Sequence, residues 1–356
     1  MQHPTRVGKY KIDAFLGGGM SHVYRAIDPV LQRTVAVKVM TEQALIDAEA
    51  RGKFLQEARI AALLEHENII RILDFGEECR EDEAPRPYMV LEYVEGESLR
   101  KTIQDKRTGS TAQKLRIALQ GAKALAYVHS RQIVHRDIKP ENLHMERGGK
   151  VRLMDFGVAK SISAEAQSGA ASEAGATAIG TPFYMAPEQV LGREPTNLTD
   201  IYAFGLMAYE LFTGERPVPG KTVDEIFHHI LYDPLNEEPW TAAGVPQVVQ
   251  ELFARCTNKQ LAQRPQSMDE ICEEIEKCLA PPTKPTRIDS STQPEMVPGV
   301  LSSSYQRPEP TLRLRMPPRP GLSAEHTAQS AVEVAKPAAA QAAPDKQPQA
   351  LAKVMA

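Results

Sequence analysis

Cysteine and tryptophan are scarce in this chain of 356 residues, which has four cysteines and one tryptophan. The cysteines form no CxxC pair and have no histidine at zinc-ligand spacing, which excludes the common zinc motifs. Scattered cysteines in a chain of this length fit buried free thiols in a reducing compartment. We therefore expect a cytoplasmic protein whose thiols stay unpaired. The four positions are Cys79, Cys256, Cys272 and Cys278.

Long apolar runs and a strong charge of one sign are also missing. The longest apolar run, Ile201 to Phe212, is about a dozen residues and is interrupted by Glu210, whereas a bilayer span needs roughly 20. The start, Met1 to Gly8, has no apolar stretch of the kind found in a signal peptide. A net charge of -4 and a pI near 6.2 give no electrostatic case for nucleic acid as a partner. We expect neither a membrane span nor nucleic-acid binding.

The composition changes sharply near residue 280. Residues 281–356 hold 13 of the 27 prolines and carry a net charge of +3, which leaves -7 on residues 1–280. A Pro/Ala-rich segment with few aromatics cannot bury enough apolar surface to fold, so we expect a disordered tail. Its basic piece Arg313–Arg319 either docks on an acidic surface or is simply solvated linker, and composition favours the linker.

Within residues 10–280 the pattern predicts an α+β, two-lobed fold. Short β-branched or aromatic runs predict strands at 10–16, 23–27, 34–39, 69–74 and 88–93. Helical periodicity predicts helices at 44–64, 114–129, 201–213, 223–230, 247–257 and 268–278. The result is a β-rich lobe over about 10–94 and an α-rich lobe over about 95–280, and ligands favour the crevice between such lobes.

The most informative motif is His135-Arg-Asp-Ile-Lys-Pro-Glu-Asn142, which follows the strand-like 132–134. It presents a carboxylate, a lysine and an amide in one loop. The motif resembles the catalytic loop of protein kinases, and specifically of bacterial Hanks-type serine/threonine kinases. The resemblance implies that Asp137 orients the substrate hydroxyl, Lys139 contacts the γ-phosphate of ATP and Asn142 binds Mg²⁺. A solvated charge run in a turn is the weaker interpretation.

Two further motifs carry the same resemblance. Asp155 opens Asp-Phe-Gly157 at the end of a strand, thirteen residues after Asn142, and the family places a Mg²⁺ ligand there. Val35-Ala-Val-Lys-Val39 resembles the strand whose lysine holds the α/β-phosphates, so Lys38 takes that role and Ala36 borders the nucleotide. Glu57 is the expected partner of Lys38, with Glu65 and Glu49 as alternatives.

The glycine-rich stretch between the first two predicted strands resembles the loop that covers the nucleotide, but it departs from the family pattern. Measured against G-x-G-x-x-G-x-V, it is one residue short, and a simple flexible hairpin is an equal interpretation. A strand follows the glycines, which excludes a Rossmann fingerprint. The resemblance assigns nucleotide contacts to Leu16, Gly17, Gly18, Gly19, Met20, Ser21 and Val23.

After the fifth strand, Leu91-Glu-Tyr-Val94 resembles the hinge whose backbone binds adenine, through Glu92 and Val94. Leu91 would border the rear of the pocket. His144 is polar where the family has an apolar residue, and we interpret it as a satisfied core histidine.

Gly180-Thr-Pro-Phe-Tyr-Met-Ala-Pro-Glu188 resembles the end of a kinase activation segment. The family places Thr181 against Asp137 and Lys139, and pairs Glu188 with Arg264. Asp200 is expected to be the N-cap of its helix and to bond the catalytic-loop backbone. The Ser/Ala/Gly-rich stretch before this segment predicts a phosphorylation switch at Thr177, or at Thr181, that acts through Arg136.

The sequence thus predicts a kinase that transfers the γ-phosphoryl group of ATP, with Mg²⁺, to Ser/Thr hydroxyls of proteins. Its expected partners are ATP, protein substrates and a second copy for autophosphorylation. Two alternatives stay open. One is a pseudokinase or scaffold, favoured by the short glycine loop and His144, and the other is a small-molecule phosphotransferase of similar fold, which the Gly180–Glu188 match disfavours.

Overall fold

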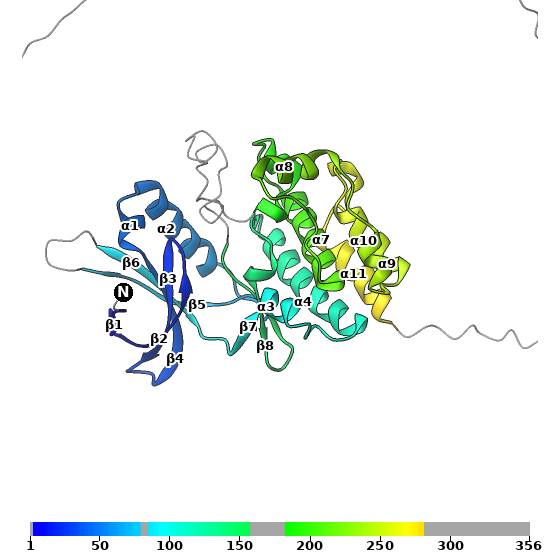
Figure 1. Cartoon of the computed structure of the whole chain (residues 1–356). Coiled ribbons are helices and arrows are strands. Elements are labelled where there is room, and N and C mark those ends of the chain that lie inside the picture. The colour runs from blue at the N-terminus through cyan, green and yellow to red at the C-terminus, as the bar shows by residue number, and fades with distance from the viewer. Residues whose placement is uncertain (1–2, 80–84, 157–181, 281–356) are drawn as a thin grey trace, which may run out of the picture. The chain divides into compact units, whose positions relative to one another are not determined.

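The computed structural model describes residues 3–79, 85–156 and 182–280, all within the contact unit Met1–Thr286. Figure 1 shows a sheet with two helices at one end of this unit and a helical bundle at the other. The proposed tail and most of the proposed activation segment lie outside the described residues. In the described part of the chain, no helix has both the length and the apolar character needed to cross a bilayer.

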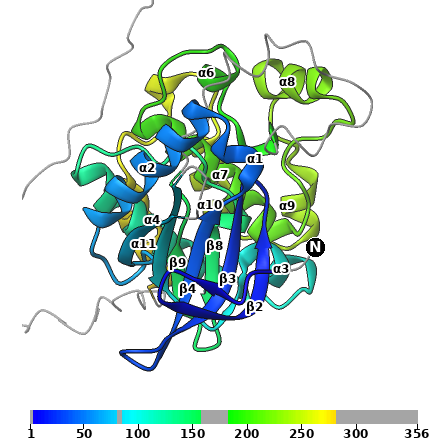
Figure 2. The same ribbon diagram turned by 90° about the vertical axis from the view of Figure 1, so that its left-hand side faces the viewer.

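The first lobe is an antiparallel sheet of order β1-β2-β3-β4-β6-β5. Every predicted strand of this lobe is present, although the one predicted at 69–74 begins later, at Ile72: Ile69 and Ile70 instead pair with Leu153 of the other lobe. The strands are β1 (Arg6–Val7), β2 (Tyr10–Gly18), β3 (Ser21–Asp28), β4 (Arg33–Met40), β5 (Ile72–Glu78) and β6 (Arg86–Glu92). Figure 2 shows this sheet from its own side.

The predicted helix over 44–64 is two helices, α1 (Glu42–Leu45) and α2 (Ala48–Ala62). Asp47 separates them because its backbone is extended and its carboxylate accepts from the Glu49 amide, as an N-cap does. On α2, Phe54 and Ala58 are buried in one cluster with Met89 and Leu91 of the sheet. This packing sets the height of α2 over β4, and therefore the position of Glu57.

The second lobe is built on α4 (Thr111–Ser130) and α7 (Asn197–Thr213). Fourteen consecutive residues of α7, Thr199 to Phe212, are buried, so this helix is the axis of the lobe's core. The other elements are α3 (Leu99–Gln104), α6 (Pro187–Val190), α8 (Val223–Tyr232), α9 (Glu238–Ala242), α10 (Gln247–Cys256) and α11 (Met268–Leu279).

A small sheet, β7 (Gly96–Ser98), β8 (Leu143–Glu146) and β9 (Val151–Leu153), lies where the lobes meet. The sequence pattern did not predict β7 and β8, which are three and four residues long. The strand expected at 132–134 is absent, since this segment has no ladder partner. The short turns Pro140–Asn142, Pro182–Tyr184 and Leu261–Gln263 are 3₁₀ helices.

The four cysteines are free, but Cys79 is exposed and Cys278 is half-buried. The expectation of buried thiols is therefore wrong for Cys79, which directly follows the outer strand β5 and has no core to enter.

Candidate active site

Lys38 of β4 joins the two lobes through two carboxylates. Its Nζ is 2.7 Å from Glu57 Oε1 on α2 and 2.9 Å from Asp155 Oδ1 beyond β9. Burial alone would lower the pKa of Lys38, but the charges of Asp155 and Glu57 outweigh it and raise that pKa. Lys38 is thus a permanent cation at the junction, and Glu57 is its partner as predicted. Of the two alternatives, Glu49 lies near Lys53 and Glu65 near Arg71.

Asp155 is held in an unusual backbone conformation, with φ of 55°. A non-glycine residue in this region is strained and persists only where its surroundings enforce it. The preceding residue, Met154, supplies part of that enforcement, because its amide donates to Asn142 O at 2.9 Å and its carbonyl faces His135 Nε2 at 3.2 Å. The Lys38 cation keeps the pKa of Asp155 below its usual value although burial acts to raise it.

The loop after α4 brings Asp137, Lys139 and Asn142 together. Lys139 Nζ is 2.8 Å from Asp137 Oδ2, and Asn142 Nδ2 donates to Asp137 O at 2.7 Å and Oδ2 at 3.0 Å. Because the amide nitrogen of Asn142 faces Asp137, the predicted carboxylate, cation and amide form one constellation. We infer that such an arrangement can orient a hydroxyl while holding phosphate oxygens.

Asp200 of α7 fixes the backbone of this loop. Its carboxylate accepts from the amides of His135 and Arg136, each at 2.8 Å. Arg136 has a φ of 69°, so the loop carries strain that these bonds offset. The predicted contact with the loop is confirmed, but the N-cap prediction is wrong. Thr196 is the N-cap, because its hydroxyl accepts from the Leu198 amide, and Asp200 lies inside the first turn.

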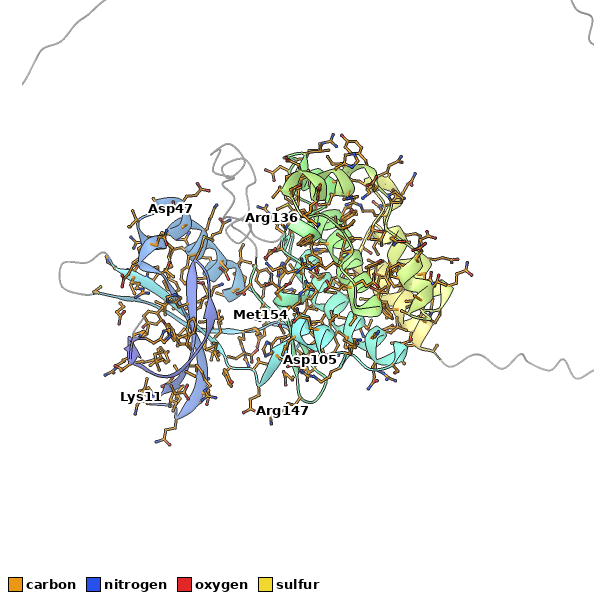
Figure 3. All side chains as sticks on the ribbon, in the orientation of Figure 1. Lys11, Asp47, Asp105, Arg136, Arg147 and Met154 are labelled. Carbon is orange, nitrogen blue, oxygen red and sulfur yellow. The ribbon has the colours of Figure 1, made fainter. Side chains whose placement is uncertain are left out.

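Two further residues that the sequence motifs did not indicate support this loop. His129 Nε2 lies 2.8 Å from the same Asp200 carboxylate, and Gln189 of α6 donates to the Arg136 carbonyl at 3.2 Å. Figure 3 labels Arg136 on the side of the helical lobe that faces the sheet. Both supports are ordinary polar residues in the sequence, and only the fold reveals their partners.

The glycine-rich stretch is a tight hairpin between β2 and β3. Gly17 pairs with Val23 and Gly18 with His22, and Gly19 and Met20 form the tip. A Cβ at Gly18 would lie 2.2 Å from the Ser21 carbonyl oxygen, so only glycine fits there. The Met20 carbonyl accepts from the Thr41 amide and hydroxyl, each at 3.1 Å, which ties the tip to the end of β4.

The strand register brings several predicted nucleotide contacts near Lys38. Val23 of β3 lies opposite Lys38, and Ala36 lies opposite Leu91 of β6. Ala36, Leu91, Val23 and Val94 belong to one apolar cluster. Glu92 ends β6, and its carboxylate accepts from Arg152 at 3.2 Å. Leu16 lies in β2 just before the glycines and is exposed, and Ser21 is the first residue of β3 after the tip and is half-buried.

His144 follows Asn142 by two residues on β8, and its ring is half-buried. Burial lowers the pKa of His144, so the ring is neutral at neutral pH. Its Nε2 is buried without a hydrogen-bond partner among the described residues. The prediction of a fully satisfied histidine is therefore wrong at this nitrogen.

Glu188 and Arg264 form the predicted buried pair. The guanidinium donates to both carboxylate oxygens, at 2.8 and 3.0 Å, and the Thr199 hydroxyl also donates to Glu188 at 2.8 Å. Arg264 further donates to the carbonyls of Leu198 and Asn258. The pair fastens α6 onto the start of α7 and onto the 3₁₀ turn Leu261–Gln263, which Arg264 ends. Thr177 and Thr181 lie outside the described residues.

Comparison with known proteins identifies this architecture. Residues 10–275 match the family model described as the protein kinase domain. The chain belongs to the protein kinase domain family. The serine/threonine-protein kinase PrkC of Bacillus subtilis is 36% identical over 71% of this chain and 38% of its own length. PknB of Mycobacterium tuberculosis, another serine/threonine-protein kinase, is 36% identical over 64% of this chain and 36% of its own length.

The fold is also similar to that of a solved structure. The crystal structure of Rad53 1-466 in complex with AMP-PNP superposes with a TM-score of 0.61 at 24% identity, over 75% of this chain and 64% of that one. The two-lobed α+β prediction is confirmed. The chain spans about two fifths of the length of the curated relatives it matches.

Proposed function

We propose that this kinase domain is an active serine/threonine protein kinase that transfers the γ-phosphoryl group of ATP to protein hydroxyls. The single observation that carries the proposal is the complete chain of charges from Glu57 through Lys38 to Asp155, next to Asp137 and Asn142. Phosphoryl transfer depends on positioning and electrostatic stabilisation, and these groups supply both. The named serine/threonine kinases among the relatives support the acceptor class.

The residues present fit Mg²⁺. The Asp155 carboxylate and the side-chain carbonyl of Asn142 are the hard oxygen ligands this ion prefers. A bound Mg²⁺ would neutralise charge on the phosphates during transfer. Lys38 would hold the α/β-phosphates, Lys139 the γ-phosphate, and Asp137 would orient and accept the proton of the attacking hydroxyl. The glycine hairpin would cover the nucleotide, and the hinge at Glu92 and Val94 would hold its base.

Asp137→Asn tests this assignment directly. We expect transfer of labelled phosphate to a generic protein substrate, with ATP and Mg²⁺, to fall on the order of a hundredfold or more, because the hydroxyl loses its proton acceptor. Asp105→Asn is the matched control, since Asp105 is a surface residue at the end of α3 that pairs with Lys101 and Arg107 (Figure 3). Equal rates for wild type and Asp137→Asn would favour a scaffold over an enzyme.

The short glycine hairpin should weaken the grip on ATP, since fewer backbone amides can reach the phosphates. One or two lost hydrogen bonds correspond to about 1–3 kcal/mol, or roughly 5- to 150-fold in affinity. Inserting one glycine after Gly17 should therefore tighten ATP binding measured by calorimetry. An insertion after Gly148, in the exposed β8–β9 turn, is the control. Unchanged or weaker ATP binding in the Gly17 variant would contradict the idea.

Regulation by phosphorylation is part of the same proposal. A phosphate at Thr177, or at Thr181, adds about -1.5 to -2 charges that Arg136 can receive, and Arg136 adjoins Asp137. Thr177→Ala should lower the rate on a protein substrate and leave ATP affinity nearly unchanged. Mass spectrometry after incubation with ATP should find the phosphate in wild type and not in Asp137→Asn. Equal rates for phosphatase-treated and autophosphorylated enzyme would exclude the switch.

The remaining parts of the proposal concern the surroundings of the enzyme. One copy would phosphorylate another, so the rate of autophosphorylation should rise with protein concentration.

The free cysteines support a cytoplasmic location. Residues 281–356 would recruit a partner or substrate and be dispensable for transfer.

A further inference from the structure

Three metal-ligating side chains gather at the C-terminal end of α8, a helix that the catalytic assignments leave unused. His228, His229 and Asp233 each offer one ligand atom, and these atoms lie within 4.8 Å of one another. Both imidazole Nδ1 atoms face the same carboxylate oxygen, Asp233 Oδ2, at 3.8 Å from His228 and 2.5 Å from His229. Figure 1 shows α8 at the outer edge of the helical lobe.

The helix itself produces this convergence. Ile226 and Ile230 are buried and fix the orientation of α8 on the lobe. His229 and Asp233 are one turn apart and therefore share a face. Asp233 is the C-cap with an extended backbone, so its side chain belongs both to the helix end and to the loop that follows. His228 is more exposed, with 64% of its side chain accessible. Its ring is therefore free to rotate toward the Asp233 carboxylate.

These three donor atoms suit a metal ion of borderline hardness. Two imidazoles and one carboxylate suit Zn²⁺ and its neighbours, which bind such atoms at about 2.0–2.2 Å. Ligands at these distances in a tetrahedral site lie about 3.3 Å apart. The separations of 2.5 and 3.8 Å from Asp233 Oδ2 to the two imidazole nitrogens lie on either side of that value, and all three donor atoms lie within 4.8 Å of one another.

A cavity adjoins the cluster and leaves room for a further ligand. It has a volume of about 90 Å³, and both His229 and Asp233 line it. Lys259 lines the cavity too, but its Nζ donates to the Ile230 carbonyl at 2.7 Å and to the Tyr202 hydroxyl at 3.1 Å.

We propose that His228, His229 and Asp233 bind a divalent transition-metal ion of the zinc class, with water from the adjoining cavity as the fourth ligand. The ion would hold the last turn of α8 to its C-cap Asp233 and present an open coordination position at the surface. A simple ion pair between His229 and Asp233 is the competing interpretation, because the pair also stabilises a helix C-terminus.

Titration of the metal-free full chain with Co²⁺ and then Zn²⁺, in excess Mg²⁺, tests the site. We expect one Co²⁺ per chain with visible absorption typical of tetrahedral nitrogen and oxygen ligands, and displacement by Zn²⁺. His228→Ala and Asp233→Asn should each lower Zn²⁺ affinity, measured by calorimetry, by more than about tenfold. Asp224→Asn, an exposed acid on the first turn of α8, is the matched control and should bind as wild type does.

Circular dichroism of the metal-free variants separates loss of a ligand from loss of the fold. Because His228 is largely exposed, His228→Ala should melt at the wild-type temperature and still lose the metal. Equal Zn²⁺ affinity in wild type and in both ligand variants would overturn the proposal. So would the absence of stoichiometric binding, or a thiolate-to-cobalt charge-transfer band, which would place the ion on a cysteine.

Discussion

Replacing Lys38 with methionine is expected to lower the rate of phosphoryl transfer on the order of a hundredfold or more. The reason is that Lys38 does two things at once. It would contact the phosphates, and it also holds Glu57 and Asp155, at 2.7 and 2.9 Å, in one arrangement across the two lobes. Without the ammonium group, two carboxylates would face each other with no cation between them, so Asp155, the proposed Mg²⁺ ligand, would lose its position.

Initial rates with labelled ATP, and ATP affinity measured by calorimetry, give the two readouts for this variant. Lys101→Met is the matched control, because Lys101 is an exposed lysine on α3 whose side chain is 57% accessible. Glu57→Gln separates the two roles: it keeps the phosphate contact of Lys38 but weakens the tether, so its loss of rate should be smaller. A Lys38→Met enzyme that works at the wild-type rate would remove Lys38 from the catalytic machinery.

The sequence predicted which residues meet at the proposed catalytic centre, because these residues occur in short motifs with fixed spacing. Asp137 and Asn142 lie in one loop, and Asp155 ends the next strand, so local geometry nearly determines their meeting. The pairing of Lys38 with Glu57 was less determined, because three glutamates were available near α2. The deciding factor was the packing of Phe54 and Ala58 against the sheet, which periodicity indicated but which only the fold could orient.

What the sequence did not reveal is the network of long-range polar contacts. Arg100 of α3 donates to Glu141 next to the catalytic loop at 2.8 Å, and also contacts Tyr184 and the buried Glu210 of α7. These residues are separated by 41 to 110 positions in the chain, so no periodic pattern connects them. Such contacts arise only when α3 and α7 are packed. The break at Asp47, which the single helix predicted over 44–64 missed, does have a local signal, because an aspartate before Ala48-Glu49 is a typical N-cap.

The buried pair Arg264–Glu188 should make the largest single contribution to stability among the ion pairs described. Arg264→Leu leaves Glu188, with 5% of its side chain accessible, without its cation. Removing one partner of a buried pair costs about 3–5 kcal/mol in the free energy of unfolding. Urea titration followed by circular dichroism measures this value. Arg255→Leu, at an exposed pair with Glu274 on the same lobe, should cost less than about 1 kcal/mol.

The pH dependence gives a second test of the same pair. Burial acts to raise the pKa of Glu188, but the hydrogen bonds and charge of Arg264 outweigh it and keep that pKa below the usual value. The pair's stabilisation is therefore fully present above the pKa of an unfolded glutamate, about 4.3, and is lost as pH falls through the lower folded value. The difference in unfolding free energy between wild type and Arg264→Leu should shrink in acid.

A double variant with leucine at both positions should recover part of the loss, since no unpaired charge is buried. Equal stability of the single and double variants would show that Glu188 finds another partner.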